Sequence, residues 1–434
     1  MVDSERSKKS GNGSTLVRSG YAPRRPAQPI IDDDLGSACE AETMRILMLG
    51  WELPPRISGG LGRACGELLA HLGCCEPLHI TFVLPELPCR NEAYPTYKGV
   101  EVIAMDLDEQ ACHFSFRHSR PLLPTASAYG ANDACSTAYA DACEKLVRKS
   151  RRHFDLIHAH DWLTFSAAVR IKERLNVPLV AHVHSTEHDR SATPDKNICR
   201  IEKLGIDSAQ SVVAVSQYTR ATVAEKYGCD SAKLEVIYNG ATVGDTSVRR
   251  EREQDEAKTV VFIGRLTYQK GAEYFVEAAT EILQRFPATQ FVVVGDGEEM
   301  AVLRSLVRAL QLIQHFSFVG FLGFSEVRQV LESSDILVMP SISEPFGLVA
   351  IEAASIGIPT VISSNSGVAE ILTSAPRIEP ANSSAISRVV IELLSDRGVH
   401  AEVGRKVRAE AGTLSWEKTA FKVQSLYQRL LERK

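Results

Sequence analysis

The sequence lacks a long hydrophobic run, and this absence excludes a transmembrane helix from its expected structure. None of the apolar stretches in the 434 residues approaches the ~20 residues that a membrane span requires. The first residues, MVDSERSKKSGNGS, are charged and polar, so they do not resemble the apolar region of a secretory leader. We therefore expect a cytoplasmic protein without a membrane-spanning segment.

Excess positive charge and paired cysteines are also lacking. The formal net charge is -5, so no overall positive field would attract nucleic acid. The ten cysteines lie between Cys39 and Cys229, and none forms a CxxC pair. This distribution is typical of the reduced thiols of a cytosolic protein. We expect no nucleic-acid partner, and any anionic ligand must be bound by local positive groups.

What the sequence has instead is a repeated alternation of short apolar runs with helical stretches. The runs expected to be strands are residues 44–49, 78–84, 100–105, 155–159, 178–184, 211–215, 234–237, 259–264, 291–295, 316–320, 335–340 and 359–363. Near-continuous apolar strands that alternate with helices indicate parallel sheets covered on both faces. The predicted fold class is α/β, with two doubly wound Rossmann-like domains facing across a cleft and ligands beyond the carboxyl ends of the strands.

Polar segments divide the chain. Residues 1–43 are rich in Ser, Gly, Pro and charge, which predicts a disordered tail, with a regulatory or partner-binding role as the alternative. The charged residues 248–258 predict a linker between an N-terminal domain over 44–250 and a C-terminal domain over 256–415. Residues 416–434 predict an amphipathic helix that packs back on the domain pair. Its apolar stripe would contain Trp416, Phe421, Val423, Leu426, Tyr427 and Leu430.

A glycine-rich loop, SGGLGR (58–63), follows the first expected strand and precedes a helix. Gly59 and Gly60 would let the backbone approach a ligand, and the helix N-terminus would offer free N–H groups to an anion. The spacing matches neither GxGxxG nor GxxxxGK[ST], which argues against a dinucleotide site and a P-loop. A simple tight turn is the alternative.

Histidines concentrate at the ends of two expected strands. His158, His160, His182, His184 and His188 are five of the twelve histidines. Within each HxH pair the two side chains share one face of a strand, because i and i+2 point the same way. A zinc site is one interpretation. Hydrogen-bonded core histidines are another for His158 and His182. For His184 and for His160 with the neighbouring Asp161, we prefer a polar site that contacts sugar hydroxyls.

Two further loops place charge at strand ends. Arg265 and Lys270 follow the first strand of the second half, and two cations there suit a diphosphate, although exposed surface cations are the alternative. The loop SEPFGLVAIE (343–352) then runs into a helix expected from Phe346. The amides of Phe346, Gly347 and Leu348 would point at a phosphate. Glu344 could address a sugar hydroxyl, and Glu352 could accept hydrogen bonds from a ribose.

These motifs together resemble those of the retaining glycosyltransferases of family 4 and the related glycogen and starch synthases, which have the GT-B fold. The resemblance covers about residues 44–434. The matching segments, in the family's order, are WELPPRISGGLG (51–62), HAHDW (158–162), HVHSTEHDR (182–190), AVSQYTR (214–220), VIYNG (236–240), FIGRLTYQKG (262–271), VVGDGEE (293–299), FVGFL (318–322) and SEPFGLVAIEAASIGIPTVIS (343–363). The resemblance implies a nucleoside-diphosphate sugar as co-substrate and a carbohydrate as acceptor.

The resemblance also implies roles for single residues. Arg265 and Lys270 would neutralise the donor diphosphate, Glu344 would contact the transferred sugar and Glu352 the ribose. The Gly59–Gly60 loop and the amides after Glu344 would complete a phosphate cradle. His184 would line the donor sugar and Asp161 the acceptor side. Asp296, Gly297 and Phe318 would lie near the base. No cofactor and no metal is expected, since cations would balance the charge that develops as the C1–O bond breaks.

One feature departs from the glycogen synthase pattern. Those enzymes usually carry a lysine before the two glycines, whereas this chain has Ile57 and Ser58, with Arg56 and Arg63 nearby. The leading interpretation is a glycogen-synthase-like hexosyltransferase that transfers glucose from UDP- or ADP-glucose to a glucan. The alternative is a family 4 transferase with a lipid, envelope polysaccharide or small-molecule acceptor. The basic run 148–152 keeps peripheral membrane contact open, although a solvated helix end explains it equally.

Overall fold

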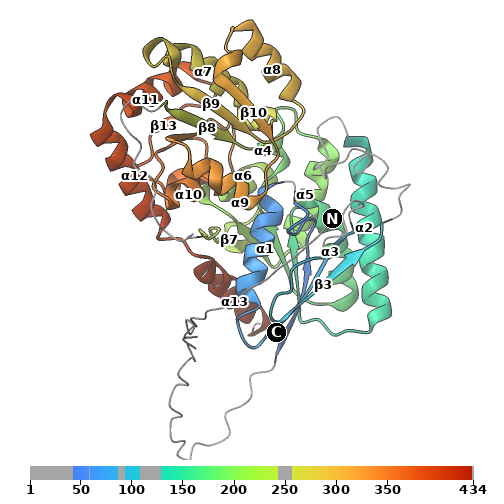
Figure 1. The fold of residues 1–434 in the computed structure, drawn as a ribbon. Helices are drawn as coiled ribbons and strands as arrows, with labels where there is room; N and C mark the ends of the chain where they lie inside the picture. Colours follow the sequence, from blue (N-terminus) through green and yellow to red (C-terminus); the bar gives the residue numbers. More distant parts are fainter. Residues whose placement is uncertain (1–42, 58, 87–92, 108–128, 243–256, 433–434) are drawn as a thin grey trace, which may run out of the picture. The chain divides into compact units, whose positions relative to one another are not determined.

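The computed structural model describes residues 43–57, 59–86, 93–107, 129–242 and 257–432. The predicted tail over 1–43 and linker over 248–258 lie almost wholly outside these residues. Within them the chain forms two parallel sheets with helices on both faces (Figure 1). The described helices include none that is long and apolar enough to cross a bilayer.

The first sheet has seven strands in the order β3-β2-β1-β4-β5-β6-β7, all paired in parallel. Its strands are β1 (Met44–Leu49), β2 (Leu78–Pro85), β3 (Val100–Met105), β4 (Leu156–His160), β5 (Leu179–Val183), β6 (Ser211–Ala214) and β7 (Leu234–Val236). The helices of this half are α1 (Gly60–Leu72), α2 (Tyr129–Ser150), α3 (Trp162–Leu175), α4 (Glu187–Arg190), α5 (Lys196–Ser208) and α6 (Gln217–Tyr227).

The second sheet has six parallel strands in the order β10-β9-β8-β11-β12-β13. Its strands are β8 (Thr259–Ile263), β9 (Gln290–Val294), β10 (Phe316–Gly320), β11 (Ile336–Met339), β12 (Thr360–Ser363) and β13 (Arg377–Ile378). The helices that follow are α7 (Ala272–Arg285), α8 (Met300–Ala309), α9 (Phe324–Glu332), α10 (Leu348–Ser355), α11 (Ser383–Ser395), α12 (Arg397–Ala411) and α13 (Trp416–Glu432). In each sheet the strand order reverses beside the first strand of that half, between β1 and β4 and between β8 and β11. Doubly wound sheets bind ligands at this point, beyond the carboxyl ends of the strands.

The apolar runs become strands because they are buried on both faces. Every residue of β4, β5, β6, β11 and β12 is buried. Each sheet separates two hydrophobic clusters, one under the helices of each face. Such strands cannot alternate apolar and polar residues, so their near-continuous apolar pattern is the expected signal of a covered parallel sheet.

The last helix, α13, packs against the first half rather than the second. Trp416, Val423 and Tyr427 belong to the hydrophobic cluster beneath α1, and α13 runs alongside α1 (Figure 1). Phe421 does not join the predicted stripe, since 66% of its surface is exposed. It lies five positions after Trp416, so the helical period of 3.6 residues turns it away from the packed face.

Candidate functional site

The carboxyl ends of the two sheets carry different groups of polar side chains. We call one group the charged edge; it follows β8 and β11 and consists of Arg265, Lys270, Glu344, Gly347 and Glu352. We call the other the histidine edge; it follows β4 and β5 and consists of His158, His160, His182, His184 and Asp161. Seven of these ten residues were predicted site residues; His160 was considered for the sugar site, and His158 and His182 had hydrogen-bonded core histidines as an interpretation.

The loop after β8 brings Arg265 beside the loop after β9. The amide of Leu266 donates to the carbonyl of Asp296 over 2.9 Å, and the amide of Glu299 donates to the carbonyl of Leu266 over 3.0 Å. A β-carbon on Gly297 would lie 2.2 Å from that carbonyl oxygen, so only glycine fits this approach. Asp296 and Gly297 therefore lie directly against the loop that carries Arg265.

Lys270 and Glu344 form an ion pair. Lys270 ends a 3-10 turn over Tyr268–Lys270, and its Nζ lies 2.6 Å from Glu344 Oε2, to which Ser341 Oγ also donates over 3.1 Å. The side chains are 19% and 10% exposed, so the pair is only partly accessible to water. A phosphate bound here would contact an ammonium whose orientation Glu344 already fixes.

Two helix N-termini meet beside Arg265, and neither has a capping side chain. Helix α1 begins after Gly59 without a cap and without an acidic residue in its first turn. Helix α10 begins after Gly347, whose φ of 105° is a conformation that favours glycine. A β-carbon on Gly60 would lie 3.7 Å from Leu348 Cδ1, and one on Gly59 3.9 Å from Arg265 Nε. Uncapped helix N-termini with their positive dipole ends bind anions in many proteins, so this meeting point is a candidate anion site.

Glu352 contacts a residue of the other half. In α10 it forms an ion pair with Arg63 of α1, and the Arg63 guanidinium lies 3.9 Å from the centre of the Phe324 ring. Burial raises the pKa of the Glu352 carboxyl, and the Arg63 charge opposes that rise. The sequence predicts that Glu352 binds a ribose, and the structure pairs this carboxylate with Arg63, in the helix that follows the glycine loop.

The four strand-end histidines form two hydrogen-bonded pairs. His158 Nε2 lies 3.1 Å from His182 Nδ1, and His160 Nδ1 lies 2.9 Å from His184 Nε2. The pairs stack on each other, with ring centres 4.4 Å apart between His158 and His160 and 4.3 Å apart between His182 and His184. The hydroxyl of Tyr427, on α13, lies 2.5 Å from His158 Nδ1. A neutral imidazole has one N–H donor and one acceptor nitrogen. In each pair one ring can therefore donate to the other while both remain neutral.

The zinc interpretation is not favoured by this geometry. Nitrogen and sulfur atoms of Cys65, His160 and His184, and nitrogens of His158, His160 and His182, do lie within 4.8 Å of one another. In both groups, however, two nitrogens already lie at hydrogen-bond distance from each other. A metal ion would have to replace these bonds and turn stacked rings toward one point.

Burial disfavours the charged forms of the side chains at the histidine edge. It lowers the pKa of His158 and of His184 to about 3, and lowers those of His160 and His182 well below the usual value. Burial also raises the pKa of Asp161 to about 7, against the opposing effects of Arg190 and of the backbone amides of His184 and Ser185. At neutral pH the four imidazoles are uncharged and exchange hydrogen bonds, whereas the Asp161 carboxyl gains or loses its proton in this range.

Asp161 occupies a strained backbone conformation. Its φ of 57° and ψ of 173° are rarely adopted by residues other than glycine. Its Oδ1 accepts a hydrogen bond from the His184 amide over 2.7 Å, and its own amide donates to the His182 carbonyl over 3.0 Å. These bonds fix the Asp161 carboxyl beside His184, so the two predicted residues lie together.

Polar contacts join the loop of Glu344 to the first half. Ser343 Oγ donates to Asp189 Oδ1 over 2.7 Å and lies 2.9 Å from the Tyr218 hydroxyl. One residue past Glu344, the Pro345 carbonyl accepts a hydrogen bond from Ser216 Oγ over 2.6 Å. The loop of Glu344 is therefore held by α4 and α6 of the first half.

The sequence reasoning did not single out Asp189, Ser343 or Tyr218, although each lies inside or beside a recognised motif. Glu370 was missed entirely; it accepts hydrogen bonds from the amides of Gln217 and Tyr218 at the start of α6. It ends the 3-10 turn Gly367–Glu370 after β12, in a segment that the sequence analysis did not consider as a site.

Phe318 is the one predicted residue that the structure places in a different setting. Its ring packs with the hydrophobic cluster of the second sheet, and Arg304 of α8 lies 5.0 Å from its centre. Both contacts lie within the second half, away from the residues of the charged edge. Its assignment to the base stays a prediction.

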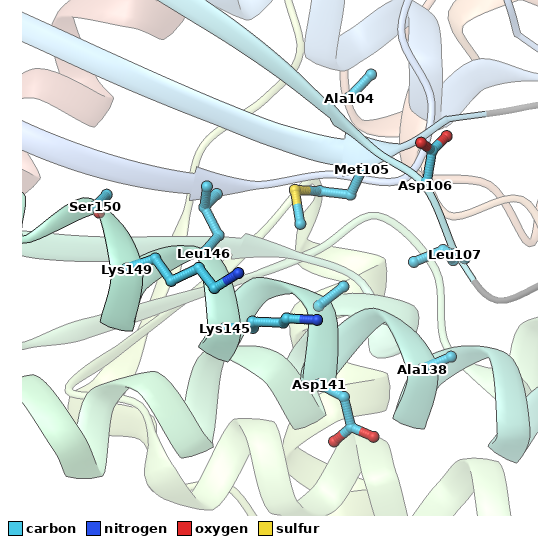
Figure 2. A pocket seen from close by; sticks show the side chains of 11 residues that line it. Ala104, Met105, Asp106, Leu107, Ala138, Asp141, Lys145, Leu146, Lys149 and Ser150 are labelled. Atoms are coloured by element: carbon cyan, nitrogen blue, oxygen red, sulfur yellow. The ribbon is translucent and has the colours of Figure 1, made fainter.

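A separate pocket lies between β3 and α2. The residues that line it are Ala104, Met105, Asp106, Leu107, Ala138, Asp141, Ala142, Lys145, Leu146, Lys149 and Ser150 (Figure 2). None of them was predicted as a site residue. The pocket is thus distinct from both edges, although Lys149 belongs to the basic run at the end of α2.

Two family models match successive parts of the chain. The one described as "Glycosyltransferase Family 4" matches residues 100–243, and the one described as "Glycosyl transferases group 1" matches residues 245–410. The first match covers the histidine edge and the second covers the charged edge.

Curated relatives align over almost the whole chain. An uncharacterized glycosyltransferase of Methanocaldococcus jannaschii is 29% identical, with 90% of this chain and 99% of that protein covered. A glycogen synthase of Mycobacterium tuberculosis is 27% identical, with 88% and 94% covered. A D-inositol 3-phosphate glycosyltransferase of Corynebacterium urealyticum is 25% identical, with 89% and 96% covered.

Solved structures share the fold. A sucrose-phosphate synthase of Thermosynechococcus elongatus superposes with a TM-score of 0.75 at 20% identity, covering 90% of this chain and 100% of the other. The catalytic domain of starch synthase IV from Arabidopsis thaliana, bound to ADP and acarbose, superposes with a TM-score of 0.69 at 16% identity and the same coverage.

Proposed function

This chain belongs to family 4 of the glycosyltransferases and has the GT-B fold, and from that premise we propose that it transfers a glucosyl group from a nucleoside-diphosphate sugar to an α-glucan with retention of configuration. The relative named glycogen synthase and the starch synthase bound to ADP and acarbose support a glucan acceptor and UDP- or ADP-glucose as donor.

The observation that carries the proposal is the meeting of two uncapped helix N-termini beside Arg265. A diphosphate has two anionic groups, and this place offers backbone N–H groups from two helices with two cations next to them. Helix N-termini bind phosphate through these free amides and the positive end of the dipole. A neutral ligand would gain little from such an arrangement.

In the proposed reaction the cations act on the leaving group. Arg265 and Lys270 stabilise the negative charge that develops on the nucleoside diphosphate as its bond to C1 breaks. Glu344, held by Lys270 and Ser341, accepts a hydrogen bond from a hydroxyl of the transferred sugar, and Glu352 accepts from the ribose. His184 lines the sugar, and Asp161 lies on the acceptor side.

Retention is proposed to follow from attack on the face that the diphosphate leaves. The acceptor hydroxyl forms the new bond to C1, its proton passes to the departing phosphate oxygen, and the C1–phosphate bond breaks. The chain then needs no side-chain nucleophile. We propose that no metal takes part, because Arg265 and Lys270 supply the charge balance. We propose that the enzyme is cytoplasmic, in keeping with the described cysteines, among which no disulfide is formed.

A small-molecule or lipid acceptor is the second candidate. The relative that acts on D-inositol 3-phosphate shows that similar chains are named for phosphorylated small molecules. Arg148 and Lys149, both exposed near the end of α2, belong to the basic run that would favour an anionic membrane. A glucan acceptor would need neither feature.

The test is a release assay with the purified full-length chain. UDP-, ADP- and GDP-sugars are each incubated with glycogen, with inositol phosphate, with anionic lipid vesicles or alone, and nucleoside diphosphate is measured. Release from UDP- or ADP-glucose that glycogen stimulates supports the proposal. Release stimulated only by lipid or inositol phosphate supports the second candidate. If no donor turns over with any acceptor, and Lys270→Ala does not change donor binding, the transferase assignment fails.

A further inference from the structure

Arg63 is a charged residue of the first half whose described partners both belong to the second half. It lies in the first turn of α1, forms an ion pair with Glu352 of α10, and lies over the ring of Phe324 of α9. Only 15% of the Arg63 side chain and 12% of the Glu352 side chain are exposed. The contact therefore places a paired cation and carboxylate at the margin of the proposed donor site.

Glu352 depends on Arg63 for its charge. Burial disfavours the carboxylate, the Glu67 charge adds to this effect, and Arg63 is the cation that opposes both. A buried carboxyl without a cation takes up a proton more readily. It then presents one hydroxyl donor in place of a second acceptor, and two adjacent hydroxyls of a ligand can no longer both donate to it.

The pair is not explained by stability alone. Buried ion pairs contribute little net free energy compared with apolar side chains of similar size. In addition, Arg63 Nη2 is buried and has no hydrogen-bond partner among the described residues, although such donors are normally paired. An ion pair that leaves one guanidinium N–H group unpaired suits a ligand that supplies an oxygen.

We propose that Arg63 is a positioning residue for the ribose of the donor: it holds the Glu352 carboxylate as the acceptor of both ribose hydroxyls, and its Nη2 donates to the same ribose. The inference rests on the proposed function. It also bears on the glycine loop, which lacks the lysine that glycogen synthases usually carry before the two glycines. Because Arg63 is paired with Glu352, we do not expect Arg63 to take the place of that phosphate-binding lysine.

The alternative is a purely structural clamp between the halves. Loss of a structural clamp would change the binding of every ligand alike. Loss of a ribose-positioning residue would weaken the binding only of ligands that carry the ribose hydroxyls. The two readings are separated by comparing UDP and ADP with their 2′,3′-dideoxy forms, which keep the base and the diphosphate.

The experiment measures binding of these four nucleotides to the full-length chain by calorimetry. Arg63→Met and Glu352→Gln should each weaken UDP or ADP binding by about 10–30-fold, the loss expected for hydrogen bonds to a charged group. Binding of the dideoxy forms should change by less than about twofold, and the double variant should be no weaker than either single variant. Arg63→Gln replaces Arg63→Met if the latter does not fold.

Arg56→Met is the matched control. Arg56 also pairs with a carboxylate, Glu86, and also lies over a ring, 4.9 Å from the centre of Tyr94, and both Glu86 and Tyr94 belong to the first half. The Arg56→Met variant should bind all four nucleotides with the affinity of the wild type. For Arg63→Met, affinity for UDP should recover as pH rises, because the pKa of Glu352, raised by burial and by the Glu67 charge, is no longer opposed by Arg63 and the carboxyl loses its proton only at higher pH.

Equal losses for ribose and dideoxy nucleotides would overturn the inference and leave the proposed function standing. The same holds if Arg56→Met shows the ribose-dependent loss. If the wild-type chain binds none of the four nucleotides, the proposed function fails and the inference fails with it.

Discussion

The charged edge and the histidine edge end two sheets of the same kind, yet they have opposite electrostatic character. The charged edge holds ion pairs, Lys270 with Glu344 and Glu352 with Arg63. The histidine edge holds buried imidazoles that stay neutral and a carboxyl, Asp161, whose pKa is raised to about 7. Full charges suit a diphosphate and neutral polar groups suit sugar hydroxyls, so loops rather than sheets determine the chemistry.

The largest effect is expected at the charged edge. Lys270→Ala should lower kcat/KM for donor turnover by roughly 10²–10³-fold, because the leaving diphosphate loses a cation and Glu344 loses its partner. Steady-state release of nucleoside diphosphate measures the change. Lys226→Ala is the control, since Lys226 pairs with Glu225 on the exposed surface. If Lys270→Ala were as active as this control, the charged edge would not have the role in binding the diphosphate that separates it from the histidine edge.

The histidine edge should make the protein sensitive to acid. The pKa of His158 and of His184 is about 3 in the folded chain, whereas an unfolded histidine titrates near pH 6.5. The unfolded state therefore binds more protons in this window, and stability falls as pH falls below about 6.5, by up to about 1.4 kcal/mol per pH unit for each histidine. Urea unfolding at several pH values measures the slope.

His158→Gln should make that acid slope shallower. His79→Gln serves as the control because His79 is exposed on β2 and should leave the slope unchanged. An unchanged slope in His158→Gln would show that the imidazole is not held neutral by burial.

Asp161 should change the stability of the protein with pH in the direction opposite to that of the histidines. Its folded pKa of about 7 exceeds the unfolded value, so the folded state binds more protons and its stability contribution falls as pH rises from about 4 to about 7. Asp161→Asn, whose side-chain oxygen can still accept from the His184 amide, should gain stability relative to the wild type over this range. The difference between the two unfolding curves cancels the histidine effect. A constant difference would mean that the carboxyl is ionised throughout.

The smallest effect is expected where the first half holds the loop of Glu344. Ser343→Ala removes the hydrogen bond to Asp189 and the contact with Tyr218, but leaves Glu344 paired with Lys270. KM for the donor should rise by about 3–10-fold with a smaller change in kcat. Ser305→Ala, on the exposed face of α8, is the control. A larger fall in kcat than in affinity would indicate that the chain of bonds acts on the reaction itself.

Much of the architecture could be predicted because burial leaves a local signal. Residues 44–49 coincide with β1, in which every residue except Arg45 is buried. Residues 316–320 coincide with β10, an edge strand that alternates half-buried and exposed residues. The start of α10 was predicted two residues early, at Phe346. Gly347 takes a left-handed conformation that ends the preceding loop, and the helix begins at Leu348.

The partners within the site could not be predicted in the same way. Lys270 and Glu344 are 74 positions apart, and His158 and Tyr427 are 269 positions apart. Such pairs depend on how the sheets and α13 pack, which no local pattern records. The motifs identified which side chains gather at a strand end, but not that Glu352 would meet Arg63 or that the histidines would pair.

The central claim is that the charged edge binds the diphosphate and the histidine edge the sugar. Calorimetric titration of UDP and ADP into the wild type, Lys270→Ala and His184→Ala tests it most directly. Lys270→Ala should bind both nucleotides about 100-fold more weakly, whereas His184→Ala should remain within about threefold of the wild type, because these ligands contain no transferred sugar. Equal losses in the two variants, or wild-type affinity in Lys270→Ala, would contradict the claim.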